Sequence, residues 1–170
     1  PVKANPMKIW QPQELVDIAY PEPLYFTPGS AHHYSNTNTI IAGMIIEKIT
    51  GNSVVNELKK RLLEPLKLYN TTDPNDNFMW GNYSHGYSWG ENETPLPDVT
   101  ESFNTSYMGC SGALISDIYD LKTWVQALVK GSLISSSLQT QRLNAISSGE
   151  ISGYGLGIAN FGVENGKKLW

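Results

Sequence analysis

The sequence predicts an α+β fold that is predominantly helical, and three observations lead to this prediction. Apolar residues recur at helical spacing in several segments between about residues 10 and 150. The segment YGLGIANFG, which begins at Tyr154, is typical of a glycine-rich strand and opens a small antiparallel sheet over about residues 151–170. Gly, Pro, Asn, Ser and Thr are plentiful, which indicates sizeable loops. With 170 residues, the chain fits one domain, 1–170, with a core of its own.

Two helices are expected in the first 51 residues. The first is a short pattern, Gln13–Ala19, which the prolines and glycine of YPEPLYFTPGS interrupt. The second, Thr37–Thr50, is apolar almost all round, which predicts a buried helix. Gly51 is a natural stop for it, because glycine readily adopts the left-handed conformation that ends many helices.

The next helix is expected from Val54 to about Leu63. Ser53 can cap its start, and Pro65 is expected to end it. Its apolar face is predicted to consist of Val54, Val55, Leu58 and Leu62.

A long segment without helix or strand pattern, 70–107, follows. It is polar, and its aromatic residues are Trp80, Tyr83, Tyr87, Trp89 and Phe103. A loop of this length inside a compact domain is usually functional or poorly ordered.

Two further helices are expected after this loop. Ser116 can cap the first, Asp117 and Asp120 favour its dipole from the first turn, and Gly131 ends it. Its inner stripe is predicted to be Ile118, Leu121, Val125 and Leu128. The second is a weaker pattern from Ser135 to about Ile146.

Composition excludes several classes of function. The net charge is −4 and no basic stripe is present, which argues against nucleic acid as a partner. The longest strongly apolar run, 40–46, is too short to cross a bilayer. His32 and His33 are adjacent and His85 is remote, so no metal site is expected, and the sequence predicts no cofactor.

Two other features have simpler interpretations than chemistry. The single cysteine, Cys110, excludes an internal disulfide and is expected to be a small buried residue rather than a nucleophile. The glycines of GYGLG lack the spacing of a phosphate-binding loop, and no helix follows them. Close backbone packing of a strand is therefore the better interpretation.

The candidate chemistry lies in SAHHYSNTN, residues 30–38, directly before the apolar helix. Asn36 or Ser35 can cap this helix by accepting hydrogen bonds from its free N–H groups. Alternatively, Tyr34 is a general base and Asn36 binds a substrate amide, because a side-chain amide both donates and accepts hydrogen bonds. A phenol ordinarily titrates near pH 10, so a tyrosine base needs neighbouring cations. The residues alone leave both interpretations open.

Five motifs in a fixed order resemble one family over nearly the whole chain. The first contributes Phe26, Pro28, Gly29, Tyr34, Ser35, Asn36, Glu47, Thr50 and Gly51. The others are EPLKLYNTT, with Lys67 where the family usually has glycine, then HGY, GCSGALISDIYDLKTWVQALVKG and YGLGI. Together they are similar to the penicillin-recognising serine hydrolases: class C-type β-lactamases, D-alanyl-D-alanine carboxypeptidases and related esterases.

This resemblance implies the helical domain of the β-lactamase fold with the start of its C-terminal sheet, and an extracytoplasmic location. It implies acyl transfer to a serine and hydrolysis of the acyl-enzyme, with D-alanyl-D-alanine peptides, β-lactams or small esters as substrates. In the family, the tyrosine of Tyr-x-Asn serves as general base or shares that role with a lysine, and the asparagine binds the substrate amide and helps hold the lysine. Carried over, these roles fall to Tyr34 and Asn36.

The departures from the family pattern are as informative as the matches. No serine here has a lysine three residues later, and no Lys/His-x-Gly motif follows the YGLGI segment. We therefore expect a central fragment, a single partial domain that is inactive alone and whose uncovered apolar faces favour self-association. The alternative is a non-catalytic binding module that keeps the scaffold and uses the loop 70–107 as its contact surface.

Overall fold

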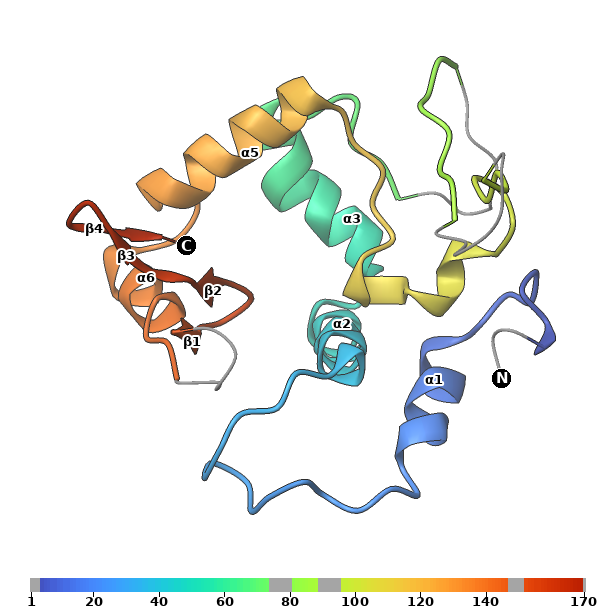
Figure 1. Cartoon of the computed structure of the whole chain (residues 1–170), viewed down its shortest axis with the longest axis horizontal. Helices are drawn as coiled ribbons and strands as arrows, with labels where there is room; N and C mark the ends of the chain where they lie inside the picture. The colour runs from blue at the N-terminus through green and yellow to red at the C-terminus, as the bar shows by residue number, and fades with distance from the viewer. Residues whose placement is uncertain (1–3, 74–80, 89–95, 147–151, 170) are drawn as a thin grey trace.

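The computed structural model describes residues 4–73, 81–88, 96–146 and 152–169. Figure 1 shows strands β1 to β4 gathered beside helix α6 at one end of the molecule, with α2 lying between this group and α1. The helices are α1 (Pro12–Ala19), α2 (Asn36–Thr50), α3 (Val54–Leu58), α4 (Glu64–Leu66), α5 (Ile118–Lys130) and α6 (Ser136–Arg142). Other helical elements among the described residues are a π-helical turn, η2 (Lys59–Leu63), and two 3-10 helices, η3 (Thr105–Tyr107) and η4 (Gly109–Ser111). The predicted α+β, predominantly helical class is confirmed.

Helix α1 begins one residue before the predicted start. Pro12 occupies its first position, where the missing N–H costs no helical hydrogen bond. The N–H of Gln11 instead donates to the carboxylate of Glu14 over 2.8 Å, which fixes the first turn. The helix then packs against α2, as Figure 1 shows.

Helix α2 ends as predicted, because Gly51 adopts a φ of 70° and its N–H bonds the carbonyl of Glu47. The prediction that α2 is buried all round is wrong. Only Ile40 and Gly43 are buried, and the exposed apolar side chains are Ile41, Ile45, Ile46 and Ile49. The described elements that contact α2 most extensively are α1, η4 and α3, and they leave these four isoleucines exposed.

Helix α3 begins at the predicted cap, since the Ser53 hydroxyl accepts from the N–H of Asn56 over 3.3 Å. Pro65 does not end the helical path. It lies inside α4, because the wider π-helical turn η2 leads into α4 and accommodates a residue that lacks an N–H. The path ends at Lys67, which takes the left-handed conformation with a φ of 57°.

The cap of α5 is Asp117 rather than Ser116. The Asp117 carboxylate accepts from the N–H groups of Tyr119 and Asp120 over 3.0 and 2.8 Å. The Ser116 hydroxyl lies 2.8 Å from that of Thr71 instead. Because a carboxylate can accept two N–H bonds at once, the aspartate is the more effective cap at this corner.

The inner stripe predicted for α5 is also wrong. Ile118, Leu121 and Val125 are 71%, 46% and 51% exposed, whereas Asp120 and Ala127 are buried. The Asp120 carboxylate accepts from the backbone N–H of Asn70 over 2.8 Å and from the hydroxyl of Thr71 over 2.9 Å. The side-chain amide of Asn70 also donates to Oδ2 of Asp117 over 2.7 Å. These three bonds turn the polar side of the helix toward the preceding loop.

The end of the chain forms two small hairpins instead of one strand. Strand β1 (Gly153–Tyr154) pairs antiparallel with β2 (Ala159–Asn160), and β3 (Gly162–Glu164) pairs antiparallel with β4 (Lys167–Leu169). The predicted strand YGLGIANFG is therefore interrupted by a turn after Tyr154. Helix α6, capped by Ser135 as predicted, is also shorter than expected and ends at Arg142 rather than near Ile146.

The loop 70–107 is only partly described, and Trp80 and Trp89 lie outside the described residues. Within it, segment 86–88 pairs with 97–99 through N–H to carbonyl bonds of 3.0 and 2.9 Å. The loop is joined to the body of the molecule by a bridge between Thr72 and Ile115. Among the helices that are described, none combines the length and the apolar character needed to span a membrane.

Candidate functional site

Tyr34 lies in the irregular segment 31–35 that leads into α2. Its side chain is 56% exposed, and its hydroxyl makes no hydrogen bond with any described residue. Its main-chain carbonyl accepts from Nδ1 of His33 over 3.0 Å. The phenol hydroxyl is therefore free to exchange a proton with a substrate.

Asn36 is the first residue of α2, and its side chain is exposed. Ser35 holds the N-cap position with extended backbone angles, but its hydroxyl makes no capping bond. The side-chain amide of Asn36 makes no hydrogen bond within the described chain either, although the main-chain carbonyl of Asn36 accepts from the Thr39 hydroxyl over 2.8 Å. The capping interpretation is thus wrong for both residues, and the Asn36 amide is available to a ligand.

A third residue, Tyr154 of β1, joins this corner from 120 positions further along the chain. Its ring meets that of Tyr34 edge to face, with centroids 6.0 Å apart and planes at 74°. The ring of His32 stacks on Tyr154 at 4.9 Å and 26°. Sequence reasoning gave Tyr154 no role, although it is the tyrosine of the YGLGI motif and that motif could have pointed to it.

The two adjacent histidines face different rings. His33 stacks on Tyr25 with centroids 4.0 Å apart and nearly parallel planes, whereas His32 faces Tyr154. In the part of the chain that the structure describes, no group of three His, Cys, Asp or Glu residues converges as a metal site would require.

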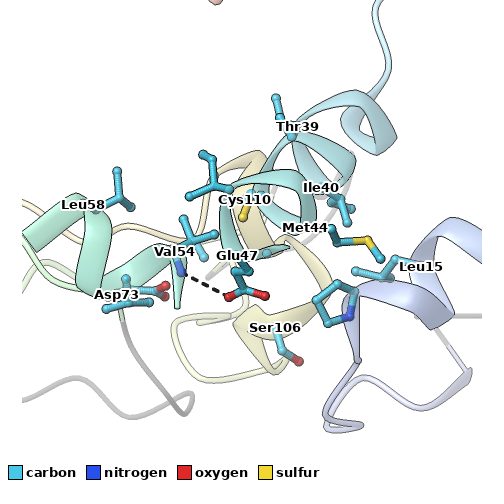
Figure 2. A pocket seen from close by; sticks show the side chains of 18 of the residues that line it. Leu15, Thr39, Ile40, Met44, Glu47, Val54, Leu58, Asp73, Ser106 and Cys110 are labelled. Carbon is cyan, nitrogen blue, oxygen red and sulfur yellow. Dashed lines mark hydrogen bonds between the residues drawn. The ribbon is translucent and has the colours of Figure 1, made fainter. Parts of the chain in front are cut away.

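A cavity of about 550 Å³ lies away from this corner, between α1, α2, α3 and residues 106–114. Figure 2 shows its lining, which is mostly apolar and includes Leu15, Ile40, Met44, Val54 and Leu58. Neither Tyr34 nor Asn36 lines it. This cavity and the residues with the expected chemistry therefore do not coincide.

The polar groups of the cavity do not form a nucleophile–base pair. The Glu47 carboxylate accepts from the N–H of Val54 over 3.1 Å (Figure 2). Burial, followed by the negative charges of Glu47 and Asp73, raises the pKa of the Cys110 thiol, so that it stays protonated at neutral pH. Cys110 as a whole residue is exposed rather than buried as expected, but its sulfur lies against Gly43 of α2 and is partly shielded from water, and it is not a thiolate nucleophile. The candidate site is therefore the corner formed by Tyr34 and Asn36, not the cavity.

A separate polar cluster joins two described parts of the loop, 81–88 and 96–107. Nδ1 of His85 lies 2.6 Å from Oδ2 of Asp98, and the Thr100 hydroxyl donates to Oδ1 over 2.6 Å. The hydroxyl and backbone N–H of Thr100, with His85, lower the pKa of Asp98 to about 2. The ring of His85 lies between those of Tyr83 and Tyr87, at centroid distances of 5.1 and 6.5 Å.

Comparison with known proteins relates this geometry to one family. The family model described as beta-lactamase matches residues 2–161. Penicillin-binding protein 4* of Bacillus subtilis is 30% identical over 163 residues, which cover 88% of this chain and 36% of that protein.

Solved structures are also similar to this chain. A D-stereospecific amidohydrolase from Streptomyces sp. is 35% identical and superimposes with a TM-score of 0.88, over 98% of this chain and 50% of its own. An octameric penicillin-binding protein homologue from Pyrococcus abyssi is 24% identical, with a TM-score of 0.79 over 95% of this chain and 38% of its own, and it shows the fold alone. The chain thus spans between about a third and a half of these proteins.

Proposed function

The chain belongs to the beta-lactamase family of penicillin-recognising serine hydrolases, and on this premise we propose that it is the part of a serine acyl-transfer hydrolase that supplies Tyr34 as general base and Asn36 as substrate-binding group. The observation that carries the proposal is the corner before α2. There an exposed phenol without a hydrogen-bond partner in the described chain precedes, by two residues, a side-chain amide that is also without one. Both groups remain available, because neither makes a side-chain hydrogen bond at the start of α2.

The reaction proceeds through a covalent intermediate. A serine hydroxyl attacks the carbonyl carbon of the substrate while the Tyr34 oxygen takes its proton, and the same proton then goes to the leaving amine or alkoxide. Water then attacks the acyl-enzyme while the Tyr34 oxygen takes a proton from it, and this proton returns to the serine oxygen as that oxygen leaves. The Asn36 side chain accepts from, and donates to, the amide of the substrate and so holds its carbonyl in line for attack.

The remaining groups come from outside these 170 residues. Acyl transfer needs a nucleophile and backbone donors for the oxyanion, and a tyrosine base needs a neighbouring cation. No Ser-x-x-Lys or Lys/His-x-Gly motif is present here. The 170 residues are a single partial domain of the whole enzyme and do not catalyse the reaction alone. The chemistry requires no cofactor.

The substrates are amides, peptides, β-lactams or small esters, with D-configured amides and peptides the first class to test. The similarity to a D-stereospecific amidohydrolase at 35% identity supports this order, as does that to a penicillin-binding protein at 30% identity. A penicillin-binding relative also supports an extracytoplasmic location.

Labelling with a fluorophosphonate tests the proposal, because this reagent traps an activated serine as a stable adduct that intact mass detects. Four proteins are compared: the full-length protein, its Tyr34→Phe variant, a control variant Tyr20→Phe, and the 170-residue chain. We expect stoichiometric labelling of the full-length protein and of the control, whose substituted residue is 84% exposed. Loss of the base slows labelling of Tyr34→Phe by at least about 100-fold, and the 170-residue chain gains no mass.

Three results would contradict parts of this proposal. An adduct on the 170-residue chain places the nucleophile within it, and peptide mapping identifies the residue. Unchanged labelling of Tyr34→Phe removes the base role from Tyr34. Absence of any adduct on the full-length protein favours the non-catalytic binding module.

A further inference from the structure

We infer that Tyr154 is a positioning residue for Tyr34: its ring, mounted on β1 and backed by His32, fixes the direction in which the Tyr34 phenol points. This inference rests on the proposed function of Tyr34. It assigns a task to the YGLGI motif, which contains no general base or nucleophile of its own.

The backbone of Tyr154 is held rigidly. Its N–H donates to the carbonyl of Ile146 over 2.7 Å, and its carbonyl accepts from the N–H of Ile146 over 2.9 Å. It also pairs with Ala159 in the β1–β2 hairpin. A residue whose N–H and carbonyl are both bonded to the same partner, and which stands in a hairpin, has little freedom to shift, so its side chain starts from a fixed point.

The glycines on either side allow this close mounting. A Cβ at Gly153 would lie 2.9 Å from the Ala145 side chain, and one at Gly155 would lie 2.2 Å from the carbonyl oxygen of Arg142. Neither position has room for a side chain. The two glycines therefore allow β1 to lie against the end of α6. Of the three residues in Gly-Tyr-Gly, only the tyrosine has a side chain, and it points away from this contact.

The ring of Tyr154 then links two parts of the chain. His32 stacks on it with centroids 4.9 Å apart, and Tyr34 meets it nearly perpendicular, at 74°. Edge-to-face contact is a favoured arrangement of aromatic rings, because the positive edge of one meets the negative face of the other. The ring of Tyr154 thus contacts both His32 and Tyr34.

Tyr34 itself has few other restraints. It stands in an irregular segment, is 56% exposed, and its hydroxyl has no hydrogen-bond partner in the described part of the chain. Within that part, the ring contact with Tyr154 is what selects one orientation of the phenol. Since proton transfer depends steeply on geometry, loss of the contact should lower the rate of the chemical step more than substrate binding.

A double-mutant cycle in the full-length protein tests this inference. Its variants are Tyr154→Leu, Tyr34→Phe and the combination, with Tyr154→Phe to restore the ring and Tyr119→Leu, a 75% exposed residue of α5, as a matched control. We expect Tyr154→Leu to lower kcat by about 10- to 100-fold with little change in KM. Tyr154→Phe should recover most of the rate, and Tyr119→Leu should equal the unmodified protein.

The combined variant decides between positioning and general structural damage. If Tyr154 acts through Tyr34, then Tyr154→Leu lowers kcat no further once Tyr34 is phenylalanine, because the group it positions is gone. Fully multiplicative effects of the two substitutions would overturn the inference, as would an unchanged kcat in Tyr154→Leu. An unchanged kcat in Tyr34→Phe would instead overturn the proposed function, so the two failures are distinguishable.

Discussion

At the scale of single residues, Asp98 is the clearest case of a side chain whose ionisation is tied to the fold. It accepts the hydroxyl and the backbone N–H of Thr100 over 2.6 and 3.0 Å and faces Nδ1 of His85. These groups all favour the carboxylate over the carboxylic acid. They lower its pKa from 3.8 to about 2, with the Thr100 hydroxyl as the largest cause.

The direction of this shift predicts how stability depends on pH. A carboxylate whose pKa is lower in the folded than in the unfolded state stabilises the fold above the unfolded value of 3.8, and this contribution is lost as pH falls toward 2. When the pH is lowered from 5 to 2, the urea concentration at the unfolding midpoint should decrease. We expect this decrease to be smaller in Asp98→Asn than in the unmodified protein. Thr100→Val, which removes the main donor, should show an intermediate slope. Equal slopes in all three proteins would contradict the assignment.

Some of the residue-scale features were predictable because they are decided locally. Gly51 and Gly131 end their helices with φ values of 70° and 66°, a conformation that glycine adopts without strain. Lys67 adopts the same conformation at a φ of 57°, which explains why the family usually has glycine there. The contact between Tyr34 and Tyr154 was not predictable, because no local pattern relates residues so far apart in the chain.

At the scale of elements, the starts of α2 and α3 differ although serine precedes both. The Ser53 hydroxyl accepts from the N–H of Asn56, whereas the Ser35 hydroxyl makes no capping bond. The same residue type in the same position therefore stabilises one helix and not the other.

This difference predicts unequal costs for the same substitution. We expect Ser53→Ala to lower the free energy of unfolding by about 1 kcal/mol, the usual value of a serine cap. Ser35→Ala serves as the matched control and should leave that free energy unchanged. Urea titration followed by circular dichroism measures both. Equal losses would mean that the Ser35 hydroxyl also caps its helix in solution.

Helix positions could be predicted from the sequence better than helix faces. The periodic apolar residues of 118–130 identify a helix correctly, but they do not say which side turns inward. The buried carboxylate of Asp120, with its partners at residues 70 and 71, decides that orientation, and these partners are some 50 positions away. The strand expected from Tyr154 onward is divided for a related reason, since Gly155 packs on the carbonyl of Arg142 and the chain must turn there.

At the scale of the whole molecule, the described chain exposes two apolar helix faces. Ile45 and Ile49 of α2 are 52% and 78% exposed, and Val125 and Val129 of α5 are 51% and 75% exposed. Burying one such side chain fully is worth roughly 1.5 to 3 kcal/mol, so contiguous faces of this kind favour association.

The self-association expected from the sequence is accordingly a prediction for the 170-residue chain in solution. We expect the weight-average mass in sedimentation velocity to rise with concentration over a tenfold range. The double variant Ile45→Lys, Val125→Lys should reduce this rise, because a lysine charge opposes burial of either face. A chain that remains monomeric throughout the range would contradict the prediction.

The ring contact between Tyr34 and Tyr154 also determines when, during protein synthesis, the site can form. During synthesis the two tyrosines leave the ribosome 120 residues apart, which at ordinary translation rates corresponds to roughly 6 to 24 seconds. Glycines 153 and 155 must then be seated against α6 before Tyr154 can reach its partner. A nascent chain that stops before β1 therefore carries the tyrosine of the site without the ring that orients it.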